Sequence, residues 1–460
     1  MLSKDNYKVT SGGLRMKTFK HLLLASVFTL SFAGNTAKAE ELSLEDALAR
    51  GLATNPEYGV VANNRRATDE ELRQARGLFL PSVDLTANAG VEYTDDQGTR
   101  ADGVEDRSRG IYDYSATLTQ MLFDGFAAFN EVDRQEARVD SAAHRVHETA
   151  ELVGLDIVEA YLEVLRQRDL LMIARDNVQE HVSMLNEIIA TVQAGRSTEA
   201  DIAQAEARLA AARANEANVK EALRVAEARY ITEIGEKPDI LIMPALPVDA
   251  LSTDVDEAVS TAMTMSPTLG IFEADMNVAW EEYEATEAGF WPELDLQLQG
   301  RQNDDLGGQD GNDQSASAQL IMNWNIYRGG IDTALRREHV YRHAQAKESK
   351  VDAARTLEND VRQTWAAMVS AGERAAEFTA QATANEKVVA AYKDQFELDR
   401  RTLLDVLDSQ NELFVSRSNA VNAEYLEMLA VYRILALQGR LMPTLGVSLP
   451  AEASAKMVDY

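Results

Sequence analysis

The 460-residue sequence contains two copies of one pattern, and this repeat restricts the possible folds more than any single motif does. Pro56 lies 25 residues before Pro81, and Pro267 lies 25 residues before Pro292. The copies are 211 residues apart at these prolines and 204 apart further on. The pairs at the second offset are Phe123 and Tyr327, Tyr161 and Trp365, Thr198 and Thr402, Asp201 and Asp405, and Gly235 and Gly439. Such a repeat predicts one structural unit used twice. The change of offset predicts a longer loop in the first copy.

The N-terminus has the pattern of an export signal. Two lysines precede an apolar run over 22–32, and small residues suited to signal cleavage follow at 37–39. We therefore expect residues 1–39 to be a signal peptide, with Met16 as an alternative start and Glu40 as the first mature residue. The apolar run is too short to span a bilayer as an anchor.

Composition excludes several classes of protein. The formal net charge is -30, which disfavours binding to nucleic acid and to anionic lipid surfaces. Solvation of long helices accounts for such a charge, and the same charge would bias a pore toward cations. The chain has no Cys, which rules out disulfides and an N-terminal lipid-attachment cysteine. After the leader no run of 18 apolar residues occurs, so no transmembrane helix is expected in the mature chain.

Each copy predicts the same order of elements: a helix, a β-hairpin, a long helix and a shorter returning helix. We assign residues 40–250 to the first repeat, 251–442 to the second and 443–460 to a C-terminal tail. The β-hairpins are expected at 83–123 and 294–327, the long helices at 126–193 and 331–398, and the returning helices at 198–234 and 402–438.

The hairpin segments alternate between apolar and polar residues. Period two over about ten residues indicates a strand with one apolar and one polar face. Loops rich in Asp and Gly are expected at 95–110 and 303–314. The apolar positions are Val83, Leu85, Ala87, Ala89, Val91, Tyr93, Tyr112, Tyr114, Ala116, Leu118 and Leu122 in the first copy, and Leu294, Leu296, Leu298, Ala316, Ala318, Leu320, Met322, Trp324 and Ile326 in the second.

Strands of this length with aromatic ends are typical of transmembrane β-barrels. A soluble antiparallel sheet packed on helices would show the same alternation. The export signal and the lack of a transmembrane helix favour the membrane interpretation. The candidate interfacial aromatic residues are Phe79, Tyr93, Phe123, Trp291, Trp324 and Tyr327.

The long helical segments are rich in Ala, Glu, Gln and Arg, contain no Pro and contain almost no Gly, a composition that favours helix. Each run of roughly 68 residues would extend on the order of 100 Å. Ala- and Leu-based seams such as Leu155, Val158 and Leu162 suit close packing between helices.

Strand counting then predicts an assembly. One chain offers four strands, whereas natural barrels start at about eight. An open sheet edge in lipid would leave backbone groups unpaired, at a cost of several kcal/mol each. Several chains must therefore share one barrel, and the sequence permits two, three or more.

At this point the sequence resembles the TolC family of outer-membrane channel proteins. The resemblance covers nearly all of the mature chain, and its most specific part is the segment Arg401-Thr402-Leu403-Leu404-Asp405-Val406-Leu407-Asp408-Ser409-Gln410. It implies an α+β membrane protein that forms a homotrimer. Three chains would give a shared 12-stranded barrel in the outer membrane, continued by a long periplasmic α-helical barrel of 12 helices.

The resemblance also implies roles for residues at the turn between the paired helices. Arg401, Asp405 and Asp408 match family residues that close the periplasmic entrance, and Asp201 is the first-repeat counterpart of Asp405. Rings of carboxylates select cations. Arg401 is expected to tie neighbouring helices together through charge-assisted hydrogen bonds.

Helix capping is the alternative role for two of these acids. Thr198 and Asp201, and likewise Thr402 and Asp405, have the spacing of a capping box. Asp408 lies one turn further along and has no such explanation, so it is the preferred candidate for the constriction.

The turns themselves are expected to face an adaptor protein. The residues concerned are Gly195 and Arg196 in the first repeat and Asp399 and Arg400 in the second. Asp399 departs from the family, where glycine is usual at this position, and adds a carboxylate at the turn. The partners that the resemblance implies are a periplasmic adaptor and an inner-membrane RND or ABC pump, besides outer-membrane lipid.

No enzyme, cofactor or metal site is predicted. His339 and His343 have the i, i+4 spacing of metal ligands, but no carboxylate motif accompanies them and the other repeat lacks them. A nucleophile elbow, a phosphate loop and a paired-carboxylate site are all missing.

The sequence therefore predicts an outer-membrane channel-tunnel that exports toxic small molecules such as drugs, bile salts and detergents, or secreted proteins, or both. One alternative is a dedicated type I protein-secretion duct without drug efflux. A second is a soluble periplasmic coiled-coil adaptor, against which the four amphipathic strands argue. A third, a lipid-anchored duct, is disfavoured by the lack of Cys.

Overall fold

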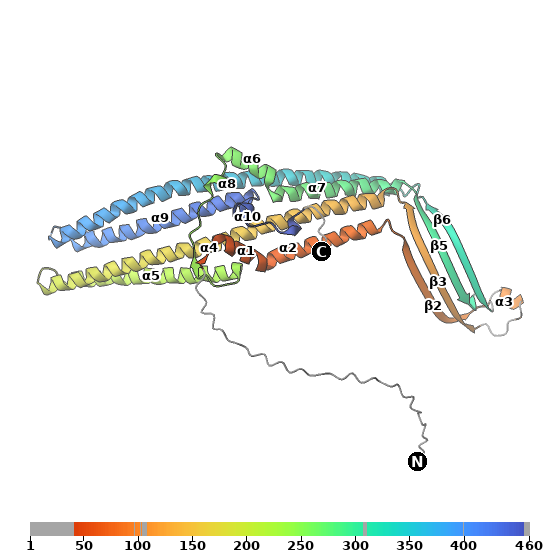
Figure 1. The fold of residues 1–460 in the computed structure, drawn as a ribbon, viewed down its shortest axis with the longest axis horizontal. Helices are drawn as coiled ribbons and strands as arrows, with labels where there is room; N and C mark the ends of the chain where they lie inside the picture. Colours follow the sequence, from red (N-terminus) through yellow and green to blue (C-terminus); the bar gives the residue numbers. More distant parts are fainter. Residues whose placement is uncertain are drawn as a thin grey trace, which may run out of the picture. The chain divides into compact units, whose positions relative to one another are not determined.

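Figure 1 shows how the helices and strands follow one another along the chain. The computed structural model describes residues 41–95, 97–101, 103, 108–306, 311–398 and 400–454. The expected signal peptide, Asp399 and the last residues of the tail lie outside this part.

The helices that precede the sheet are interrupted immediately before Pro56 and Pro267. In the first repeat α1 (Leu44–Thr54) is followed by α2 (Pro56–Gly77), and in the second α6 (Val255–Met265) is followed by α7 (Pro267–Ala285). The Asn55 side chain caps α2 by accepting hydrogen bonds from the next two N–H groups that follow Pro56. Proline at the first helical position loses no intrahelical hydrogen bond, so it starts a helix well.

Four antiparallel strands form the main sheet in the order β2-β3-β5-β6. They are β2 (Ser82–Tyr93), β3 (Ser108–Phe123), β5 (Glu293–Asp304) and β6 (Asn312–Asn323). The central pair, β3 and β5, comes from different repeats, so the two copies share one sheet. Among the described strands of this sheet, β2 and β6 each pair on one side only.

The strand register keeps the two faces of the sheet chemically distinct. The apolar residues of the four strands stand opposite one another, in rows such as Val83, Leu118, Leu298 and Ala318, and Leu85, Ala116, Gly300 and Ala316. The other face is polar across all four strands, in rows such as Asp84, Thr117, Gln299 and Ser317, and Thr86, Ser115, Arg301 and Ser315. A one-residue slip would invert both faces of a strand, so the alternation fixes the register.

The loops and strand ends differ from the sequence expectation. The first loop, expected at 95–110, contains the short helix α3 (Gln97–Ala101), and β3 begins at Ser108. In the second hairpin the ladder continues to the pair Asp304 and Asn312, so the polar ends of the expected loop are strand. Backbone pairing with a neighbouring strand outweighs the weak β-propensity of Asn and Asp here.

The second hairpin also ends earlier than expected. β6 stops at Asn323, so Trp324 and Tyr327 lie beyond the strand. The Trp324 indole N–H donates to the Phe290 carbonyl at 3.2 Å, which places the ring against the η2 segment (Thr286–Phe290). The aromatic residue therefore marks the junction between sheet and helices.

Two helical hairpins make up most of the remaining structure. The first pairs α4 (Ala127–Gln193) with α5 (Glu199–Ile234), and the second pairs α8 (Ile331–Glu397) with α9 (Leu403–Leu437). α4 also packs against α2, α7 and α9, so it connects the two hairpins. The described helices include none that is both long and apolar enough to cross a membrane.

A close approach at the start of α4 requires glycine. Gly125 has φ +71°, and a Cβ atom there would lie 2.8 Å from the Ala288 carbonyl oxygen. The end of β3 in the first repeat can therefore approach the η2 segment of the second repeat only because residue 125 has no side chain.

The main core lies around the middle of α4. A two-stranded parallel sheet of β1 (Glu41–Leu42) and β4 (Ile240–Leu241) is held against it by the Tyr161 hydroxyl, which lies 2.8 Å from the Leu42 carbonyl oxygen and 2.6 Å from that of Ile242. Burial raises the pKa of Tyr161 to about 12. The hydroxyl therefore stays protonated and remains a donor at neutral pH.

The C-terminal segment is fastened to the same region. After the short helix α10 (Leu441–Thr444) the chain runs to η4 (Ala451–Ala453), where Glu452 accepts from Arg66 at 2.7 Å. The buried Glu151 carboxylate of α4 accepts the N–H groups of Leu441 at 2.8 Å and Met442 at 3.2 Å. A buried acid thus pairs with the first N–H groups of α10.

Replacing Glu151 by Ala is expected to destabilise the protein. Two buried N–H groups would lose their acceptor, at roughly 2 to 6 kcal/mol in all. We predict a clear fall in the apparent melting temperature of the purified protein, with a smaller fall for Glu151→Gln, which keeps one carbonyl acceptor. Glu358→Ala, which removes an exposed ion pair to Arg362 on α8, is the control and should change little. Equal melting temperatures for Glu151→Ala and Glu358→Ala would contradict this role.

Candidate functional site

The turns of the two helical hairpins have matching backbone hydrogen bonds. In the first repeat the Arg196 N–H donates to the Thr191 carbonyl at 3.0 Å, and in the second the Arg400 N–H donates to the Gln395 carbonyl at 2.9 Å. Bonds of this span close a helix in the Schellman manner. Gly195 adopts φ +76°, as such a turn requires. Asp399 lies outside the described residues, so its effect on the second turn stays a prediction.

Asp201 and Asp405 both complete capping boxes at the start of the returning helices. Asp201 accepts the Thr198 N–H at 2.9 Å, and Asp405 accepts the Thr402 N–H at 3.2 Å. Hydrogen bonds from Ser197 and Thr198 lower the pKa of Asp201, and hydrogen bonds from Thr402 lower the pKa of Asp405. Both acids are therefore engaged at the helix start, which is the alternative that the spacing had left open.

Arg401 contacts residues of its own hairpin. Its guanidinium lies 4.0 Å from the centroid of the Tyr392 ring, and its Nε donates to the Gln395 amide oxygen at 3.0 Å. Asp405 lies 3.9 Å away on the next helix. Within the described residues of one chain, these contacts tie α8 to the start of α9. The role of Arg401 in closing the entrance stays a prediction.

Asp408 has a partner that the sequence reasoning missed. Its Oδ1 atom accepts from the Arg208 Nη2 atom at 2.7 Å. Arg208 lies on α5 and Asp408 on α9, so the ion pair connects the two hairpins. The first-repeat counterpart of Asp408 is Gln204, and Arg208 lies one helical turn beyond it. This placement was the sequence signal that could have pointed to Arg208.

An apolar cluster holds the hairpins together beneath these charged residues. Its buried members come from α4 and α9, and Ile202 of α5 and Tyr392 and Phe396 of α8 pack against it. All four long helices therefore meet at this end. The buried members are Met184, Ile188, Leu403, Val406 and Leu407.

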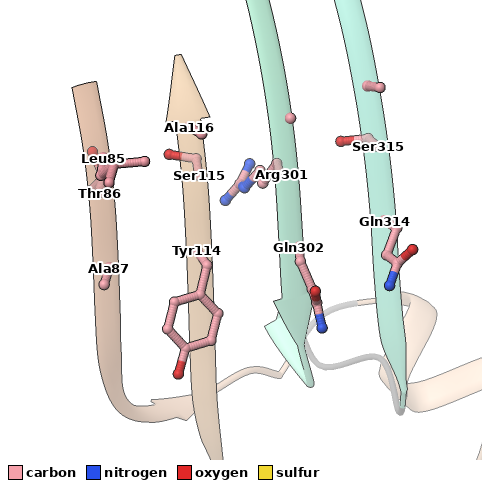
Figure 2. Close-up of a pocket in the computed structure, with 12 residues that line it drawn as sticks. Leu85, Thr86, Ala87, Tyr114, Ser115, Ala116, Arg301, Gln302, Gln314 and Ser315 are labelled. Carbon is pink, nitrogen blue, oxygen red and sulfur yellow. The ribbon is translucent and has the colours of Figure 1, made fainter. Parts of the chain in front are cut away.

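At the sheet, the ion pair between Arg301 and Asp113 lies on the polar face. Figure 2 shows Arg301 reaching from β5 toward β3, beside Ser115. Its Nε atom donates to the Asp113 carboxylate at 2.7 Å. The hollow over the sheet also has apolar lining, including Leu85 and Ala116. The polar face thus offers charged and hydrogen-bonding groups along its length, whereas on the apolar face such groups include those in a row near the hairpin loops, at Tyr114, Gln302 and Gln314.

The histidines do not form a metal centre in the part of the chain that the structure describes. His339 lies 3.9 Å from Glu282, and the His343 ring stacks edge-on against Trp280. No cluster of three or more metal-ligating side chains occurs there.

The combination of an amphipathic four-stranded sheet with two long helical hairpins defines the class of outer-membrane channel proteins. The sequence profile described as "Outer membrane efflux protein" matches residues 47–236 and 258–440. The chain belongs to this family, which confirms the resemblance drawn from the sequence motifs and the α+β fold class.

Related proteins agree with this assignment. The chain is 28% identical to the outer membrane efflux protein BepC of Brucella suis, over 92% of this chain and 91% of that protein. It is 24% identical to the proteases secretion protein PrtF of Dickeya chrysanthemi, over 88% and 89%. The solved outer membrane protein VceC of Vibrio cholerae has the same fold, with a TM-score of 0.73 at 14% identity over 88% of this chain and 97% of VceC.

Membership of this family establishes where the protein is located and what its general role is. The protein resides in the outer membrane and extends into the periplasm, and it is a channel component rather than an enzyme. This location argues against the soluble periplasmic adaptor that the sequence had left as an alternative.

The capping role of Asp405 predicts a pH-dependent effect. Because hydrogen bonds lower its pKa in the folded chain, its stabilisation is present above the ordinary Asp pKa of about 4 and is lost as pH falls through the lowered value. We expect Asp405→Ala to increase hydrogen exchange in the first turn of α9 at pH 7, with a difference from wild type that shrinks as the pH falls below the ordinary Asp pKa. Asp394→Ala, an exposed acid of α8, is the control. A difference that does not depend on pH would argue against the capping role.

Proposed function

We propose that three copies of this chain form one export channel across the outer membrane and the periplasm. The observation that carries the proposal is the four-stranded sheet with one apolar face, one polar face and two outer strands, β2 and β6, which among the described residues pair on one side only. In lipid these strands need partners, because each unpaired backbone group costs several kcal/mol. Pairing β2 of one chain with β6 of the next satisfies both.

The same geometry supports a closed barrel of three chains. Four strands from each chain give twelve, with the apolar face toward lipid and the polar face toward the lumen. The Arg301 and Asp113 pair would then line the lumen, where water solvates it.

The helices support packing between chains as well. α8 buries far fewer of its residues than α4, although the two helices have equal length. Large apolar side chains of α8 are exposed along the helix, among them Leu335, Val340, Tyr341 and Val351. A neighbouring chain on this side would bury them and would close a helical barrel of twelve helices.

The proposed cargo is toxic small molecules, secreted proteins or both. Relatives are named for efflux in BepC and for protease secretion in PrtF. A periplasmic adaptor would contact the turns at Gly195, Arg196, Asp399 and Arg400, and an RND or ABC pump of the inner membrane would supply the energy. A dedicated type I secretion duct is the second candidate. Deleting the gene, and scoring drug sensitivity and secreted proteins separately, distinguishes the two.

The periplasmic entrance would be lined by Asp408, with Asp405 and Arg401 beside it and Asp201 as the counterpart in the first repeat. Asp408 is about half exposed and takes no part in a cap. Threefold symmetry turns it into a ring of three carboxylates, an arrangement that selects cations.

A planar bilayer measurement tests the channel and its entrance together. The wild-type protein is expected to form channels that prefer cations, and Asp408→Ala is expected to reduce this preference and the block by multivalent cations. Glu358→Ala, which changes an exposed acid on α8, should behave as wild type. Failure of the purified wild-type trimer to conduct would contradict the proposed function. Unchanged selectivity in Asp408→Ala would remove this residue from the entrance.

A further inference from the structure

We infer that Arg208 determines the ion selectivity of the tunnel entrance by compensating the charge of Asp408. The inference rests on the proposed channel and on the placement of Asp408 at its constriction. It concerns a basic residue that the motif at 401–410 does not contain.

The contact between the two residues is direct. The Arg208 Nη2 atom lies 2.7 Å from the Asp408 Oδ1 atom, within the range of a charge-assisted hydrogen bond. The side chains are 38% and 53% exposed, so the pair sits at the boundary between the packed helices and water. Such a pair adds little stability. Its larger effect is on the field that an ion meets near the carboxylate.

The packing beneath the pair holds both residues in place. Asp408 follows the buried Leu407 on α9, and Arg208 lies between Ala205 and Leu209, which are buried on α5. The Arg208 side chain therefore projects from α5 at the edge of the helix face that packs against other helices. A cation fixed in this way stays near the carboxylate, whereas a mobile counterion exchanges with bulk solvent.

Groups on the neighbouring helices leave Arg208 available to Asp408. His181 of α4 is buried, and both burial and the positive charge of Arg208 lower its pKa, so the imidazole is neutral at pH 7. Glu180 of α4, the nearby acid, forms its own ion pair with Lys393 of α8. The Asp408 carboxylate is the group that Arg208 contacts across the hairpins.

The internal repeat explains why the pair occurs once in each chain. At the position of Asp408 the first copy has Gln204, and at the position of Arg208 the second copy has Glu412. Each copy therefore supplies one member of the pair. A threefold ring would contain three Asp408 carboxylates and three Arg208 guanidinium groups.

The compensation has a measurable consequence. Without Arg208, its positive charge would no longer offset the negative charge of the three Asp408 carboxylates that passing ions meet at the constriction. A unit charge at a few ångströms in water-like surroundings changes the local cation concentration by a few-fold, so we expect the cation-to-anion permeability ratio of Arg208→Gln to rise roughly two- to fivefold. Block by multivalent cations should become stronger in the same variant.

The test is the reversal potential of single channels in a salt gradient, measured on the full-length trimer. Arg208→Gln is expected to raise the cation preference, Asp408→Asn to lower it, and the double variant to return close to wild type. Arg208→Lys keeps the charge and should rescue the wild-type selectivity. If Arg208 had only a structural role, Arg208→Gln and Asp408→Asn would not shift the cation preference in opposite directions.

Arg417→Gln is the matched control. Arg417 is also 38% exposed and pairs with Glu386 at 2.6 Å, but this pair lies within the α8–α9 hairpin and includes no proposed entrance residue. Conducting wild-type channels with the same selectivity in Arg208→Gln would overturn the inference and leave the proposed function intact. Non-conducting wild-type trimers would overturn the proposed function itself, and the inference with it.

Discussion

The outer edges of β2 and β6, which pair with no other strand in the described part of the chain, are the constraint on which the rest of the structure depends. The sheet joins both repeats through β3 and β5, so each chain contributes a four-stranded segment with two open edges. Because this segment has one apolar face and one polar face, it is stable neither in water nor alone in lipid. The proposed shared barrel would satisfy both the edges and the faces, and the helices that continue from the strands would then follow the same symmetry.

Internal duplication supplies this segment, and in the proposed channel the differences between the copies place the entrance residues. Both hairpins end in the same type of turn and both returning helices start with a capping box. The two copies differ at the positions of Asp408 and Arg208. The counterpart of Asp408 is the uncharged Gln204, and the counterpart of Arg208 is the acidic Glu412. The structural parts are therefore repeated, whereas the charged pair across the hairpins is assembled from both.

Much of the fold could be predicted from the sequence, because it depends on local patterns. Period-two alternation indicated the four strands and their two faces, and the internal repeat indicated that both copies have the same order of elements. The strand ends near Asn312 and Asn323 could not be predicted, since they depend on how far a partner strand continues pairing. At the tips, spacing alone left Asp405 open between cap and gate, and the hydrogen bonds from Thr402 show it engaged as a cap. The contact of Arg208 with Asp408 joins residues 200 positions apart, and no local pattern reveals such a pair.

Cross-linking between the open edges tests the shared barrel most directly. The native chain has no Cys, so a cysteine at Thr86 on β2 can be combined with one at Asp313, Ser315 or Ser317 on β6 to sample the register. A disulfide forms readily where the Cα atoms are about 4.4 to 6.8 Å apart. The account predicts that oxidation in the outer membrane gives a covalent trimer for at least one of these pairs. A protein that inserts into the membrane but gives only monomers or dimers at every register would contradict it.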